Sequence, residues 1–247
     1  MIKKLFLTLL FSLFLTTSVF GIGFDSDTKL LIHFDGSDGS TDDYTAETGQ
    51  TVSLEGTAQL DTAQKKFGTA SLLLDGNSDY VTIPDSADWT FGSGNFTIDF
   101  WMRYTGTLNS YASLSLFYTT YGFTYMFLDT RTDGALYFAL YVDEGSILVV
   151  DSSTAITADE EHHVAVVRNG DNLALYLDGV SVANGNFSEA YSLPDFTQPI
   201  RMGNNTSTRY FNGWIDEYRI SKGVARWTAN FTPPVSEYTW RRIILIQ

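Results

Sequence analysis

The sequence has no cysteine among its 247 residues, which excludes disulfide bridges, thiolate metal sites and catalytic thiols. Histidine is scarce, because His33, His162 and His163 are the only three, and this is too few to predict a zinc site. Basic residues number 15 against 29 acidic ones, so the formal net charge is −14 at pH 7. Such a chain is expected to repel nucleic acid and anionic membrane surfaces, and oxygen-ligated Ca²⁺ is the metal that its composition favours. Solubility alone is the other explanation of the acidity.

One stretch is apolar enough to insert into a membrane. Lys3 and Lys4 precede an apolar run from Leu5 to Phe20, and small residues follow as far as Gly21. We interpret residues 1–21 as a cleaved secretory signal peptide. This predicts a secreted or extracytoplasmic protein, with the cell surface as one location. After cleavage no stable membrane span is expected. The alternative is an uncleaved anchor, for which the run is short.

Strand patterns dominate the remaining sequence. From Phe96 to Tyr104 the residues alternate at period two, with Phe96, Ile98, Phe100 and Met102 on one face and Thr97, Asp99, Trp101 and Arg103 on the other. Similar short runs recur along the rest of the chain. The last of them, Trp214 to Ile220, places Asp216 on the same face as Tyr218 if alternation is strict. A carboxylate on a core face needs a hydrogen-bonding partner or a metal ion.

Three segments carry a resemblance to a known family. They read Gly-Trp-Ile-Asp-Glu-Tyr-Arg-Ile at 213–220, Tyr-Val-Thr-Ile-Pro at 80–84 and His-His-Val-Ala-Val-Val-Arg-Asn-Gly at 162–170. These segments resemble the laminin G-like jelly-roll domains of the concanavalin A-like lectin/glucanase superfamily. The resemblance implies an all-β fold, an antiparallel two-sheet jelly-roll sandwich, over residues 22–234, followed by a C-terminal tail at 235–247.

A loop rich in aspartate and glycine follows the first strand, from Asp35 to Asp43. Aspartate supplies hard oxygens and glycine lets the backbone bend, which suits Ca²⁺, although a solvated surface turn explains the composition equally well. The resemblance implies that Asp35 and Asp216 share a structural Ca²⁺. Many relatives have a further aspartate in this loop, and the corresponding place here reads Ala-Glu-Thr-Gly at 46–49. That ligand is therefore either missing or replaced by Asp43, Asp42 or Glu47.

Catalytic patterns are absent from the sequence. Jelly-roll glycoside hydrolases commonly carry E-x-D-x-x-E on one strand, and no such run exists here. Neither a G-x-S-x-G box nor a glycine-rich phosphate loop occurs. We therefore expect a binding module and not an enzyme.

Tyrosines gather around Gly122, and exposed tyrosines stack on sugar rings and hydrogen-bond to them. The candidates for ligand contact are Tyr121, Tyr125 and Tyr210, although tyrosines also pack any β-sandwich. A glycan is the preferred ligand. The alternative is an extracellular protein, bound by an adhesion module of a surface or phage-associated assembly.

Overall fold

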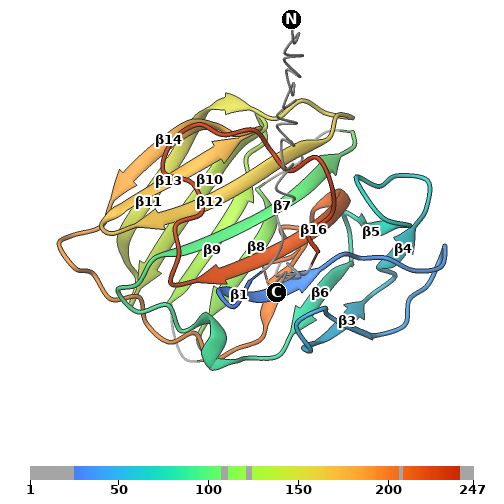
Figure 1. Cartoon of the computed structure of the whole chain (residues 1–247), viewed down its shortest axis with the longest axis horizontal. Helices are drawn as coiled ribbons and strands as arrows, with labels where there is room; N and C mark the ends of the chain where they lie inside the picture. The colour runs from blue at the N-terminus through green and yellow to red at the C-terminus, as the bar shows by residue number, and fades with distance from the viewer. Residues whose placement is uncertain (1–24, 107–110, 121–123, 206–207, 240–247) are drawn as a thin grey trace, which may run out of the picture.

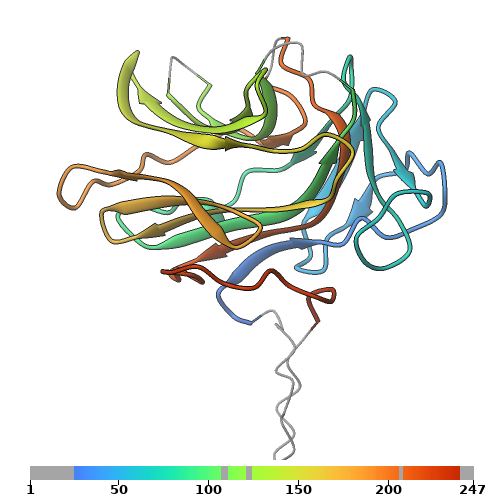
Figure 2. The same ribbon diagram turned by 90° about the horizontal axis from the view of Figure 1, so that it is seen from above.

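The protein folds as two β-sheets packed face to face (Figures 1 and 2). The structure is a computed structural model that describes residues 25–106, 111–120, 124–205 and 208–239. In these ranges every strand pairing is antiparallel, and the only helix is one 3-10 turn, Ala87–Trp89. No helix in the described part of the chain is long and apolar enough to cross a bilayer. The prediction of an all-β jelly-roll sandwich is confirmed.

Within the described ranges the first sheet contains eight strands, with β1 pairing with β16 beside the main path. In spatial order they are β14 (Val180–Asn186), β13 (Asn172–Leu177), β12 (His162–Asn169), β7 (Phe96–Tyr104), β16 (Asn212–Lys222), β5 (Ser71–Asp75) and β4 (Gln59–Asp61), with β1 at Thr28–Ile32. The last strand of the described ranges, β16, thus lies inside the sheet, between β7 on one side and β5 and β1 on the other.

The second sheet, which covers the first, also has eight strands among the described residues. In spatial order they are β11 (Gly145–Ala155), β10 (Ala135–Val142), β9 (Tyr125–Thr130), β8 (Ala112–Tyr118), β15 (Ile200–Met202), β6 (Tyr80–Ile83), β3 (Thr51–Glu55) and β2 (Tyr44–Thr45). Seen from above, the part made by β8 to β11 curves so that its outer face is concave (Figure 2).

The core lies between the sheets. Phe100 of β7 stacks on Tyr218 of β16, with the ring centroids 5.5 Å apart, and the Tyr218 hydroxyl meets Ser115 of the opposite sheet at 2.7 Å. Alternation in β7 therefore sends Phe96, Ile98, Phe100 and Met102 inward, as the sequence predicts.

A β-bulge in β16 changes where its side chains point. The pairing with β7 shifts register between Asp216 and Arg219, and Glu217 adopts φ 54°. Ile215 and Tyr218 consequently both face the core, and Asp216 lies on the outer side of the sheet. The prediction that Asp216 shares a face with Tyr218 was wrong, because the extra residue of the bulge reverses the alternation.

After β16, residues 224–239 run across the outer face of the first sheet, and we call them the C-terminal strap (Figures 1 and 2). Trp227 and Phe231 stack with their centroids 3.9 Å apart and pack on Ala165 and Tyr176. The strap continues past residue 234, because Tyr238 is buried against Leu31. The predicted tail is therefore attached to the domain through Tyr238, while Val235, Ser236, Glu237 and Thr239 are exposed.

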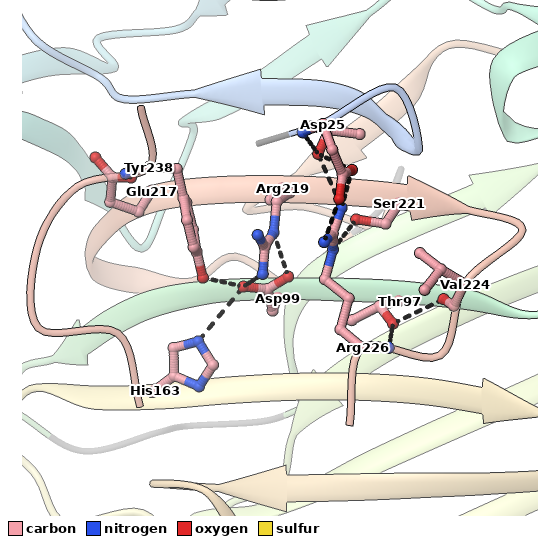
Figure 3. Close-up of polar contacts among 11 residues, drawn as sticks. Asp25, Thr97, Asp99, His163, Glu217, Arg219, Ser221, Val224, Arg226 and Tyr238 are labelled. Atoms are coloured by element: carbon pink, nitrogen blue, oxygen red, sulfur yellow. Dashed lines mark hydrogen bonds and ion pairs between the residues drawn. The ribbon is translucent and has the colours of Figure 1, made fainter. Parts of the chain in front are cut away.

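The strap covers a buried ion pair (Figure 3). Arg219 donates two hydrogen bonds to Asp99, at 2.9 and 3.1 Å, and the Tyr238 hydroxyl donates a third. His163 lies 3.5 Å from the same carboxylate. Burial opposes ionisation of Asp99, but Arg219 and His163 outweigh it and lower its pKa to about 2.

The two adjacent histidines serve different carboxylates, as strand alternation predicts. His163 faces Asp99 on the outer side, and Nδ1 of His162 lies 2.7 Å from Asp178. Each histidine therefore has a structural partner, and the pair does not converge on one ion.

Candidate functional site

The outer face of the second sheet carries an unusual row of aromatic side chains. In β9 and β10 the inward positions hold core residues such as Leu128 and Phe138, so alternation sends the residues between them to the outside. Those outward residues are Tyr125, Phe127, Tyr137, Ala139 and Tyr141, and cross-strand pairing sets Tyr125 beside Tyr141 and Phe127 beside Ala139. The aromatic face is thus fixed by the register of two neighbouring strands.

A cavity of about 400 Å³ lies over this face, and we call it the tyrosine groove. This volume falls within the range typical of ligand sites, roughly 300–1,000 Å³. The described residues that line it are Tyr111, Leu116, Tyr118, Tyr125, Phe127, Tyr137, Tyr141, Asn205 and Arg209.

The rings of the groove form a preorganised surface. Phe127 and Tyr141 are nearly parallel, at 2° with centroids 6.4 Å apart, and Tyr125 lies 5.1 Å from Tyr141. The hydroxyls of Tyr137 and Tyr141 are 3.5 Å apart. Burial and the contact with Tyr141 raise the pKa of Tyr137 well above its usual value, so its hydroxyl keeps its proton. The groove therefore offers aromatic faces together with neutral hydroxyl donors and acceptors.

Arg209 provides the cationic end of the groove. Its guanidinium lies 4.7 Å from the Tyr111 ring and 5.7 Å from the Phe127 ring, and Nη1 donates to Asp129 at 2.9 Å. Asp129 is fully buried, and its burial outweighs the attraction of Arg209 and raises its pKa to about 6.

The three tyrosines predicted to contact a ligand have different positions. Tyr125 lines the groove. Tyr210 is half-buried in a bridge with Asn204 and does not line it, and Tyr121 lies outside the described residues. The sequence analysis missed Tyr137 and Tyr141, although their spacing around Ala139 in one strand was a readable signal. Arg209 gave no such signal.

Of the predicted metal ligands, Asp216 is the most buried. Its Oδ2 accepts hydrogen bonds from the backbone N–H groups of Lys66 (2.7 Å) and Phe67 (3.1 Å). Its Oδ1 is buried with no hydrogen-bond partner in the described part of the chain. Burial raises the pKa of Asp216 to about 7, against the lowering effect of the two N–H groups. An acceptor oxygen of this kind fits a cation or a proton.

Asp35 holds the same loop as Asp216 from its other end. Its Oδ1 accepts hydrogen bonds from the backbone of Thr69 and from the N–H of Ala70, the latter at 3.2 Å. Burial and the charges of Asp216 and Asp35 raise the pKa of Tyr44. Asp35 and Asp216 thus both accept hydrogen bonds from backbone N–H groups of this loop, and the Ca²⁺ that the resemblance implies stays a prediction.

Asp43 has a different role. Its carboxylate accepts from the Ser53 hydroxyl at 2.9 Å and from the N–H of Leu54 at 3.1 Å, so it fastens the preceding loop to β3. Asp35, Asp43 and Asp216 do not form a converging set of three ligands.

The described residues contain one converging set of ligand-type side chains, made by His33, Glu217 and Glu237. Nδ1 of His33 lies 2.6 Å from Glu217, whose other oxygen accepts from the N–H of Tyr238 at 3.0 Å. Burial lowers the pKa of His33, but contact with Glu217 outweighs it and the net shift is upward. This histidine–glutamate pair fastens the strap to the end of β1.

The order of the strands in the two sheets defines an antiparallel jelly-roll sandwich. A family model described as the concanavalin A-like lectin/glucanases superfamily matches residues 75–228. The chain therefore belongs to this superfamily. No curated protein sequence matches it.

Solved structures share the fold at low sequence identity. The binding domain of Paraclostridial Mosquitocidal Protein 1 matches with a TM-score of 0.62 and 14% identity over 80% of this chain and 49% of that one. Domain 4 of AbnA, an extracellular arabinanase of Geobacillus stearothermophilus, solved with arabinotriose, has a TM-score of 0.61 and 17% identity, over 81% and 94%. The binding domain of botulinum neurotoxin DC in complex with SialylT matches with a TM-score of 0.61 and 18% identity, over 81% of this chain and 49% of that one. This chain thus spans about half the length of the two toxin domains.

Proposed function

We propose that this protein is a non-catalytic carbohydrate-binding module and that its ligand occupies the tyrosine groove. The observation that carries the proposal is a cavity of about 400 Å³ lined by five tyrosines on the outer face of a sheet. Sugar rings present C–H patches that stack on aromatic faces, and their hydroxyls bond to groups such as those of Tyr137 and Tyr141.

The structural neighbours support a sugar as the ligand. The arabinanase domain, which this chain covers almost completely, was solved with arabinotriose, and a botulinum neurotoxin domain with SialylT. The two toxin domains are binding domains by their descriptions, and this supports a role without catalysis. A protein partner has less support, because the large apolar side chains exposed in the described ranges, Val149, Val180 and Val235, belong to three different segments.

The test is a binding measurement on the intact protein with arabinotriose and a panel of neutral and acidic oligosaccharides. Tyr125→Ala and Tyr137→Ala should each weaken binding at least about fivefold, since a stacked ring contributes on the order of 1 kcal/mol. Tyr210→Ala is the matched control, because this tyrosine is half-buried outside the groove. Unchanged affinity in both groove variants would refute the proposed site, and no binding to any oligosaccharide would refute the function.

We also propose a structural Ca²⁺ held by Asp35 and Asp216, beside the loop at residues 66–70 that both carboxylates already hold. The unpartnered oxygen of Asp216 supports this assignment. Asp43, which is committed to β3, would contribute only if its loop rearranged. Calcium would cross-link the first loop to the closing strand and would take no part in sugar contact.

Export is the remaining part of the proposal. Residues 1–21 lie outside the described structure, so the support is the sequence pattern of a basic start and an apolar run. The mature protein should begin at Ile22 and appear outside the cytoplasm, and N-terminal sequencing of fractionated cells tests both statements. A mature protein that retains Met1 would contradict cleavage.

A further inference from the structure

The residues that line the tyrosine groove differ in charge from the protein as a whole. The chain carries 29 acidic and 15 basic residues, yet among the described residues that line the groove Arg209 alone is charged. A ligand entering the groove thus meets aromatic faces, hydroxyls, the Asn205 side chain and one guanidinium.

The guanidinium is held in a fixed orientation. It lies against the Tyr111 and Phe127 rings, at 4.7 and 5.7 Å, and Asp129 anchors its Nη1 at 2.9 Å. The Arg209 side chain is still 33% exposed, whereas that of Asp129 is fully buried. A guanidinium has five N–H donors in a planar fork, which matches the two oxygens of a carboxylate or a sulfate. The anchored edge faces the protein interior, and the exposed part is available to the groove.

From this geometry we propose that the groove binds an anionic saccharide and that Arg209 contacts its carboxylate or sulfate group. This specificity rests on the proposed carbohydrate-binding function and names the ligand class of the same site. The acidic group lies at the Arg209 end, and the neighbouring sugar rings lie over Tyr125, Tyr137 and Tyr141.

Asp129 modulates this contact. Its negative charge lies behind Arg209 and competes with an anionic ligand for the guanidinium. Asp129→Asn keeps the shape of the side chain and removes the competing charge, so it should strengthen binding of an acidic sugar by several-fold. The same substitution should leave a neutral sugar almost unaffected, because stacking does not depend on this charge.

A purely structural role for Arg209 makes different predictions. If the guanidinium serves only to neutralise buried Asp129, replacing it lowers the stability of the protein but does not change the preference between acidic and neutral sugars. Selectivity therefore separates the two roles, whereas stability does not.

The experiment is titration calorimetry of the intact protein with three trisaccharide probes. They are a trigalacturonate, its methyl ester and a sulfate ester of a neutral trisaccharide. Wild-type protein should bind an anionic probe better than the methyl ester. Arg209→Gln should reduce binding of that anionic probe about 10- to 100-fold and change binding of the ester less than about threefold. Arg209→Lys keeps the charge but not the planar fork, so its affinity for the anionic probe should lie between those of wild-type protein and Arg209→Gln.

Each outcome decides a separate point. Equal affinity for trigalacturonate, its methyl ester and the sulfate ester overturns the anionic specificity and leaves the carbohydrate-binding function standing. A preference for an anionic probe that survives Arg209→Gln overturns the role of Arg209. Tighter binding of the sulfate ester than of the uronate supports the proposal and names sulfate as the anion. If no probe binds, and arabinotriose does not bind either, the proposed function itself fails. Should Arg209→Gln prove unfolded by circular dichroism, Arg209→Lys and Asp129→Asn carry the test.

Discussion

The buried carboxyl of Asp216 should make the stability of this protein fall as the pH rises. Its pKa is about 7 in the folded protein, against an ordinary value of 3.8, because burial disfavours its charged form. Below pH 3.8 the group is protonated in both states and has no effect. Between pH 3.8 and 7 the unfolded chain releases the proton while the folded protein keeps it, so the free energy of unfolding decreases.

The size of the effect follows from the difference in pKa. About three pH units at about 1.4 kcal/mol each give a loss of about 4 kcal/mol by pH 7, and further increases in pH add nothing. This is a large part of the stability of an ordinary domain, about 5–15 kcal/mol. A Ca²⁺ ion bound by Asp216 would offset the loss to an extent set by its concentration and Kd, since it pairs with the charged form.

The assay is urea unfolding of wild-type and Asp216→Asn protein from pH 4 to pH 8, in EDTA and again in Ca²⁺. In EDTA the wild type should lose stability relative to Asp216→Asn by about 1 kcal/mol per pH unit or more up to pH 7. In Ca²⁺ the loss should shrink by more than half, because the metal adds about 2.7 kcal/mol of stability once it exceeds its Kd a hundredfold. Glu189→Gln, an exposed carboxylate, is the charge-matched control.

A constant difference between wild type and Asp216→Asn over this pH range in EDTA would refute the reasoning about burial. A pH-dependent difference that Ca²⁺ does not alter would keep the burial argument and remove the metal. Asp216 would then be held only by the N–H groups of Lys66 and Phe67.

The C-terminal strap and the ion pair beneath it lead to two further predictions. Tyr238→Ala should lower the free energy of unfolding by about 3 kcal/mol, because it removes a buried ring, and Tyr238→Phe by about 1–2 kcal/mol, because it removes only the hydrogen bond to Asp99. Urea unfolding measures both changes. If the free energy of unfolding of Tyr238→Ala equals that of the wild type, residues beyond 234 do not pack on the domain. Arg219→Met should cost about 3–5 kcal/mol, because it leaves a buried charge without its partner, while Arg219→Met combined with Asp99→Asn should recover much of that loss. A double variant no more stable than the single one would argue against charge burial as the cause.

The fold could be predicted from the sequence because its signals are local. Alternation in β7 identifies the core face, and the short segments shared with the superfamily fix the order of the strands. The buried position of Asp216 was also predicted, but its side of the sheet was not. A bulge depends on how β16 pairs with β7, more than a hundred residues earlier, and no local pattern reports that pairing.

The groove was only partly predictable for the same reason. Tyr125 was found because it belongs to a visible cluster of tyrosines in the sequence, whereas Tyr137 and Tyr141 join it across a strand pairing. Arg209 reaches the groove from a segment some eighty residues beyond β9, through its contact with Asp129. Residues that combine in one site from separate strands become visible only when the register is known.

The central position of β16 also dictates the order in which this protein can fold. The strand pairs with β7 on one side and with β5 and β1 on the other, so these strands cannot join into one sheet until residue 222 has been synthesised. A chain that is still growing can form the consecutive hairpins of β8 to β11, but it leaves the edges of β5 and β7 open. Shortened products should consequently aggregate and not fold into a smaller domain, and the complete chain should fold late and slowly, because its decisive contacts join its two ends.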